Sequence, residues 1–268
     1  MKKYKNYIFD LYGTLIDIET NENGLALWKK MAGLYSVYGA DYSWRELKKR
    51  YSEYVQEEEE ILREETGYTY PEIKLEKVFA RLYLEAPVRH NAERNFSSRT
   101  VESLEKSDYI HFIANAFRVT SQKKCHAYRN THKVLETLMD RGCGIYLLSN
   151  AQRIFTMPEI EQTGLMNFFD DIFISSDLGI KKPQPEFMRK LLNDNDLKIH
   201  DSVMVGNDYD SDIGIAASVG MDSIFLNTFD LSEKERDKRL NDMRKRTGAA
   251  GYSPVLTVAD GDIGKILE

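Results

Sequence analysis

The sequence predicts an α/β fold: a doubly wound, Rossmann-like parallel sheet with an inserted α-helical cap domain. Two observations lead to this prediction. From residue 127 onward, apolar strand-like segments alternate with segments of helical periodicity, which is typical of βαβ units. Residues 17–126 are instead highly charged and have the pattern of consecutive helices without a convincing strand. We therefore expect a core formed by residues 1–16 and 127–268 and a helical cap domain formed by residues 17–126.

The core strands are expected where short apolar runs end in a polar residue. The first run ends at Asp10, and four others follow at residues 143–150, 170–178, 201–208 and, more weakly, 221–227. Continuous apolar runs of this length suit parallel strands that are buried on both faces. The segments between them have helical periodicity, over residues 131–142, 158–169, 184–196 and 212–220.

The cap interval predicts helices over residues 19–39, 43–66, 71–86 and 97–120. Ser43 fits an N-cap, and Pro71 fits the first turn of its helix. The acidic run 57–60 is expected to be a solvated helix face. A cluster of aromatic residues is expected to form packing surface, namely Tyr35, Tyr38, Tyr42 and Trp44.

Composition and charge limit the kinds of function that this protein can have. The chain is 42% apolar and 30% charged with a net charge of −6, which is ordinary for a globular protein and argues against a nucleic-acid surface. The basic segment 232–247 mixes in acidic residues at helical spacing, so it predicts an exposed helix rather than a nucleic-acid arm.

Cellular location is inferred from what the sequence lacks. Cys125 and Cys143 match neither a disulfide framework nor a zinc pattern, which favours a reducing compartment. The first apolar stretch is too short for a signal peptide, and no segment approaches membrane-spanning length. We expect a cytoplasmic monomer or homodimer with a small-molecule substrate and neither nucleic acid nor membrane as a partner.

Several polar residues lie where expected strands end. In a doubly wound sheet the ligand site lies beyond the carboxyl ends of the strands, where the strand order reverses. Asp10, Ser149, Asn150 and Asp208 occupy such ends, so we expect them to converge in one crevice. A charge such as that of Asp10 is costly there unless it is paired, hydrogen-bonded or bound to metal. The alternative, a simple turn at Asp10 and Gly13, accounts for only one of these positions.

Four motifs in order resemble those of the haloacid dehalogenase-like hydrolase superfamily with a cap inserted after the first strand. They are FDLYGTL at 9–15, LLSN at 147–150, KKP at 181–183 and VGNDYDSD at 205–212. The resemblance implies that Asp10 is a nucleophile that forms a covalent aspartyl intermediate. It also implies that Lys182 is a fixed cation that contacts the nucleophile and the substrate oxygens.

The resemblance further implies a Mg²⁺ site, because the nucleophile and a phosphorylated substrate are both anionic. Its expected ligands are the carboxylates of Asp10 and Asp208 and the backbone carbonyl of Tyr12, with Asp212 binding the metal or a ligating water. Hydrogen bonds to the transferring group are expected from Thr14, Ser149 and Asn150.

Tyr12 departs from the phosphatase pattern. In the family's phosphatases this position resembles a second aspartate, which protonates the leaving alkoxide and then activates water. A tyrosine here is familiar from haloacid dehalogenases, where a halide leaves without a proton. The pair Asp208 and Asp212 favours a metal site instead, and Met188 stands where a dehalogenase would tend to carry a tyrosine. With a reference pKa near 10, Tyr12 is a possible proton donor and a poor base.

The sequence therefore predicts a Mg²⁺-dependent phosphohydrolase that acts on a small phosphorylated metabolite. A cap residue supplies the missing acid and base, or the leaving group needs little help. The alternatives are a 2-haloacid dehalogenase-type hydrolase and a catalytically weak binding protein of the same fold.

Overall fold

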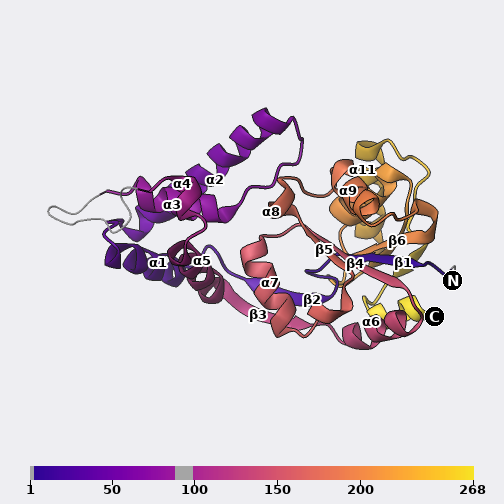
Figure 1. Cartoon of the computed structure of the whole chain (residues 1–268). Coiled ribbons are helices and arrows are strands. Elements are labelled where there is room, and N and C mark those ends of the chain that lie inside the picture. The colour runs from indigo at the N-terminus through magenta and orange to yellow at the C-terminus, as the bar shows by residue number, and fades with distance from the viewer. Residues whose placement is uncertain (1–2, 88–98) are drawn as a thin grey trace.

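A six-stranded parallel sheet forms the centre of the computed structural model, which describes residues 3–87 and 99–268 (Figure 1). The prediction of a parallel α/β core is confirmed. Every pair of neighbouring strands is parallel, and β1 lies in the middle because β4 and β6 pair with its two edges. The strands in spatial order are β5 (Asp171–Ile174), β4 (Gly144–Ser149), β1 (Asn6–Phe9), β6 (Ser202–Gly206), β7 (Asp222–Leu226) and β8 (Leu256–Val258).

Helices cover both faces of this sheet, as the alternation of side chains along each strand requires. On β1, Phe9 packs in one cluster with Val134 of α6 (Thr131–Asp140), whereas Ile8 packs in another cluster with Phe187 of α9 (Pro185–Asp194). The remaining helices of the core are α7 (Arg153–Gln162), α8 (Ser175–Leu178), α10 (Gly214–Val219) and α11 (Glu233–Thr247). The basic segment is therefore helical, as predicted. Residues 175–178 are also helical and do not extend strand β5.

A second group of helices forms a lobe at one end of the molecule, away from the sheet (Figure 1). This helical lobe comprises α1 (Leu25–Val37), α2 (Trp44–Thr66), α3 (Leu75–Leu84), α4 (Val101–Leu104) and α5 (Asp108–Ser121). It has its own apolar cluster, in which Tyr35 and Tyr42 are buried and Tyr38 and Trp44 pack against them. The predicted aromatic packing surface is thus confirmed, as is the N-cap at Ser43. The first residues of the helix predicted from residue 97 lie outside the described residues.

Two strands that the sequence did not indicate connect the lobe to the core. Strands β2 (Ile16–Thr20) and β3 (Gln122–Ala127) pair antiparallel and form a two-stranded sheet of their own, which we call the ribbon. They are short and partly exposed, and their partners lie about a hundred residues apart, so neither carries a strong local pattern. The expected absence of strands in residues 17–126 is therefore wrong.

The third predicted cap helix begins later than expected. Helix α3 starts at Leu75, and Pro71 instead forms an isolated antiparallel bridge with Ile180 of the core. The amides of Glu72 and Lys181 donate across this crossing to Gly179 and Tyr70. This segment is therefore a second place where the lobe contacts the core, directly before Lys182.

The acidic run of α2 is not a uniformly solvated face. Glu58 is buried, and its carboxylate contacts Arg81 at 2.9 Å and Lys77 at 2.6 Å. Its neighbour Glu57 is exposed and binds the same Arg81 at 2.7 Å.

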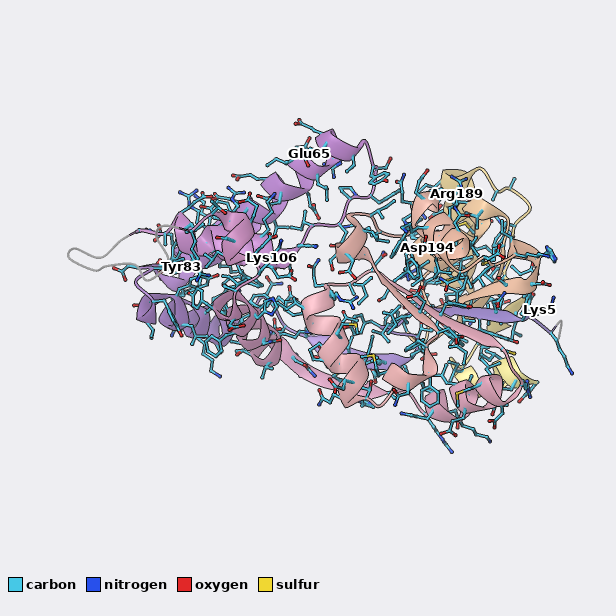
Figure 2. All side chains as sticks on the ribbon, in the orientation of Figure 1. Lys5, Glu65, Tyr83, Lys106, Arg189 and Asp194 are labelled. Atoms are coloured by element: carbon cyan, nitrogen blue, oxygen red, sulfur yellow. The ribbon has the colours of Figure 1, made fainter. Side chains whose placement is uncertain are left out.

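Figure 2 shows charged side chains such as Glu65 and Lys106 on the lobe and Arg189 and Asp194 on α9. Within the described residues, no helix is long and apolar enough to cross a membrane.

Glu57 and Glu58 are neighbours with different burial, so replacing each of them gives a matched pair of variants. Glu58→Ala should lower the free energy of unfolding by about 1.5–3 kcal/mol, because it removes the buried carboxylate that binds both Arg81 and Lys77, although Arg81 keeps Glu57 and Glu85. Glu57→Ala removes an exposed partner of Arg81 and should cost about 0–1 kcal/mol. Chemical denaturation of both variants measures the difference. Equal losses would contradict the assignment of Glu58 to the interior.

Candidate active site

Asp10 lies directly after β1, at the carboxyl edge of the sheet where the strand order reverses. The loop that follows is tight: Gly13 has a φ of 83°, and a Cβ there would lie 2.2 Å from the side-chain nitrogen of Asn207. Glycine is thus required for both conformation and space. The loop directs Thr14 back toward the strand end, where its hydroxyl donates to Asp10 Oδ2 at 3.1 Å.

Lys182 is the cation of the site. Its Nζ donates to Asp10 Oδ1 at 2.7 Å, to Asp212 Oδ1 at 2.8 Å and to the backbone oxygen of Leu148 at 2.7 Å. These contacts use all three protons of the ammonium group. Burial lowers the pKa of Lys182, but the two carboxylates outweigh that effect and raise it. The group is therefore held as a cation next to the candidate nucleophile.

Asp212 is a structural carboxylate in this arrangement. Its Oδ2 accepts hydrogen bonds from the amides of Asn207 and Asp208, each at 3.0 Å, while Oδ1 faces Lys182. Burial raises the pKa of Asp212, and Lys182 opposes that shift. A Cβ on Gly206 would lie 2.3 Å from Oδ2, so only glycine permits this approach. Both oxygens are thus committed to protein donors, and direct metal binding by Asp212 stays a prediction.

Asn207 and Asp208 both follow the end of β6, and their side chains have different hydrogen-bond partners. Asp208 caps a short π-helix, Tyr209–Ile213, by accepting from the amide and hydroxyl of Ser211 at 2.6 and 2.9 Å. Asn207 is buried, and its Oδ1 accepts from Thr14 at 3.4 Å. The sequence reasoning missed Asn207, although its place directly after the last strand residue was an available signal.

Ser149 and Asn150 follow β4 and have different surroundings. The hydroxyl of Ser149 is buried and lacks a hydrogen-bond partner within the described part of the chain. Asn150 uses both ends of its amide on the backbone of Lys182, accepting from its N–H at 2.7 Å and donating to its oxygen at 3.0 Å. Asn150 therefore positions the lysine, and its expected contact with substrate stays a prediction.

The phenol of Tyr12 points into a buried polar network. Its hydroxyl contacts Glu159 and lies 3.1 Å from the hydroxyl of Thr156, both on α7. Arg118 of α5 binds the same carboxylate with two nitrogens, at 2.6 and 3.1 Å. Burial and the Glu159 charge raise the pKa of Tyr12 far above its usual value. This network, which the sequence did not indicate, joins the first loop, the core and the lobe.

A cleft of about 320 Å³ opens between the lobe and the core beside this network. Tyr12 and Asn150 line it from the core, and Glu22, Leu75 and Arg118 line it from the ribbon and the lobe. It therefore gives a small molecule access to the loops that follow β1 and β4.

The oxygen donors at the strand ends suit a hard cation. Among the residues that the structure describes, no group of three or more His, Cys, Asp or Glu side chains is arranged to hold a metal ion. Mg²⁺ needs only one or two carboxylates and keeps several waters. Asp10 and Asp208, together with amide and backbone oxygens, provide a donor set of the right chemistry.

Comparison with known proteins identifies the family. The profile of the haloacid dehalogenase-like hydrolases matches residues 4–220. The glyceraldehyde 3-phosphate phosphatase of Methanothermobacter thermautotrophicus is 30% identical over 149 residues, which cover 55% of this chain and 66% of the relative. The chain thus spans less than two thirds of that relative.

Two solved structures share the whole fold. A 2-haloacid dehalogenase from Pseudomonas syringae pv. tomato has a TM-score of 0.62 at 17% identity, with 98% of each chain covered. A HAD phosphatase from Thermococcus onnurineus has a TM-score of 0.55 at 18% identity, covering 98% of this chain and 97% of its own. At such identities the likeness shows the fold alone.

The buried network predicts a large loss of stability when its cation is removed. Arg118→Met leaves Glu159 buried without a counter-charge, so the free energy of unfolding should fall by about 3–5 kcal/mol. Arg153→Met, which removes an exposed pair with Asp177, should cost about 0–1 kcal/mol. The double variant Arg118→Met, Glu159→Met should recover part of the loss, measured by denaturant unfolding. A double variant that loses the sum of both single effects would contradict this pairing.

Proposed function

Because the chain belongs to the haloacid dehalogenase-like hydrolases, we propose that it is a phosphohydrolase of small phosphorylated metabolites that uses Asp10 as its nucleophile. The observation that carries the proposal is the contact of a buried lysine with this carboxylate at the carboxyl edge of the sheet, 2.7 Å long. The phosphatases named among its relatives support the same reaction class.

The residues around Asp10 suit phosphoryl transfer. Two anionic groups must approach one another, and the ammonium of Lys182 offsets part of their repulsion. Thr14 and Lys182 each bind one oxygen of the Asp10 carboxylate and so fix its orientation. The buried hydroxyl of Ser149 is available to donate to an oxygen of the transferring group.

Mg²⁺ is the cofactor that these residues would accept. Asp10, Asp208 and the backbone carbonyl of Tyr12 would hold it, and the side-chain oxygen of Asn207 is a further hard donor nearby. When bound, the ion supplies charge that stabilises the transferring phosphoryl group. Asp212 would contribute by holding Lys182 and the backbone of residues 207 and 208 in place.

Carbon–halogen hydrolysis is the second candidate, and Tyr12 is the observation that favours it. The hydroxyl of Tyr12 donates to Glu159, so the position two residues after Asp10 offers no carboxyl group that could protonate a leaving group. A halide leaves without protonation, so this reaction needs no acid at that position. The same Asp10 would then attack carbon and form an ester.

The nucleophile assignment predicts that Asp10→Asn lowers phosphatase turnover by at least about 10⁴-fold, as expected for loss of a covalent nucleophile. Asp194→Asn makes the same substitution on the surface of α9 and should leave turnover unchanged. Release of phosphate from an aryl phosphate measures both. Turnover by a folded Asp10→Asn protein that matches the unmodified enzyme would refute the mechanism.

Metal removal separates the two candidate reactions. Phosphatase activity should disappear in excess EDTA and return with added Mg²⁺, because an all-oxygen site binds this ion reversibly. Halide release from 2-chloropropionate, assayed in parallel, should be absent with and without metal. Metal-independent halide release would instead support the dehalogenase.

A further inference from the structure

We propose that Glu22, which follows β2 at the base of the helical lobe, is the general acid and base of this site. It would protonate the leaving-group oxygen and later take a proton from the attacking water. The proposal rests on the proposed phosphohydrolase function and identifies the group that performs the proton transfers for which Tyr12 is unsuited.

Tyr12 is held away from proton transfer by its own contacts. Its hydroxyl donates to Glu159, whose carboxylate also accepts two hydrogen bonds from Arg118. Proton release from the phenol would place a second negative charge against the buried Glu159 carboxylate. The phenol therefore serves to fix the loop, and the acid must come from another group that faces the cleft.

Two carboxylates line the cleft together with Tyr12, and their partners distinguish them. Glu72 accepts hydrogen bonds from Gln152 at 3.0 Å and from Ser175 at 3.2 Å. No hydrogen bond or ion pair joins the Glu22 carboxylate to another residue in the described ranges 3–87 and 99–268. Glu22 alone of the two is thus free to exchange a proton with a ligand in the cleft.

The backbone of Glu22 is nevertheless anchored. Its carbonyl accepts from the indole of Trp28, which is buried in the lobe, at 2.7 Å. The preceding amide, of Asn21, donates to Ser121 at the end of α5 at 2.7 Å. A carboxylate on a fixed backbone, with its side chain directed at an open cleft, is what a positioned acid requires.

Arg118 relates the position of Glu22 to that of Tyr12. Its guanidinium carbon lies 5.7 Å from the centre of the Tyr12 ring, and its charge acts on both Tyr12 and Glu22. The two groups therefore face the same guanidinium from one cleft. Burial raises the pKa of Glu22, and Arg118, which is also paired with Glu159, opposes this only in part. Glu22 thus retains a proton closer to neutral pH than an exposed glutamate does.

The proton balance of the reaction is complete with this group. In the first half, the bond between phosphorus and the leaving oxygen breaks, Asp10 binds phosphorus, and the Glu22 proton moves to the leaving oxygen. In the second half, water attacks the phosphorus of the aspartyl phosphate and the Asp10 oxygen leaves. The proton lost by that water returns to Glu22, and inorganic phosphate is released.

The test compares first turnovers of two substrates in Glu22→Gln with saturating Mg²⁺. Propyl phosphate needs a protonated leaving group, so its first-turnover rate should fall by about 10² to 10⁴-fold. p-Nitrophenyl phosphate does not, so its first turnover should stay nearly unchanged. Because the base is also lost, a burst of one nitrophenolate per enzyme should then precede a slow steady state. The retained burst also demonstrates that the variant is folded.

Glu59→Gln is the matched control, because Glu59 lines the neighbouring part of the cleft with Glu22 but is paired with Lys181 at 3.7 Å. Both of its first turnovers should match those of the unmodified enzyme. If Glu22→Gln slows both substrates equally, or neither, the proposal is overturned while the phosphatase assignment stands. If the unmodified enzyme cleaves neither phosphate with Mg²⁺, the proposed function fails and this proposal fails with it.

Discussion

The buried ammonium of Lys182 between Asp10 and Asp212 is the interaction on which the candidate site depends. Each buried ion costs several kcal/mol in desolvation, and the two carboxylates would repel one another without a cation. The lysine compensates both effects and thereby joins its own loop to the loop after β1 and to the π-helix that holds Asp212. Asn150 adds a fourth loop by binding the lysine backbone. The position of Asp10 is therefore a property of the assembled sheet edge.

A second buried charge pair connects this edge to the lobe. Arg118 and Glu159 bring α5 and α7 together. The hydroxyl of Tyr12, in the loop after β1, contacts the same carboxylate. The contact that orders the loop thus also removes the phenol from acid–base chemistry. In the proposed mechanism, proton transfer then comes from Glu22, which follows β2 on the lobe side of the cleft. That mechanism couples attachment of the lobe to the chemistry proposed for Asp10.

The three aspartates of the site have identical side chains but different contacts, because their surroundings differ. Asp10 is oriented by Thr14 and Lys182, Asp212 is held by two backbone amides, and Asp208 caps the π-helix. The resemblance to the family groups Asp208 and Asp212 as a pair at a metal site. The π-helix and the close approach to Gly206 turn Asp212 inward toward the lysine, and metal binding by this pair stays a prediction. Local spacing alone does not contain that information.

The sequence by itself determined five of the six strands of the parallel sheet, all but β8, their order along the chain and the helical character of most of the insertion. These features follow from apolar periodicity and strand-end residues, which are local. Its motifs also singled out Asp10, which follows β1, and Lys182, which lies in the loop after α8. The ribbon, the burial of Glu58 and the network of Tyr12, Glu159 and Arg118 were decided only by tertiary structure. Each joins residues distant in sequence, and their pairing energy exists only once burial has removed water from the charges.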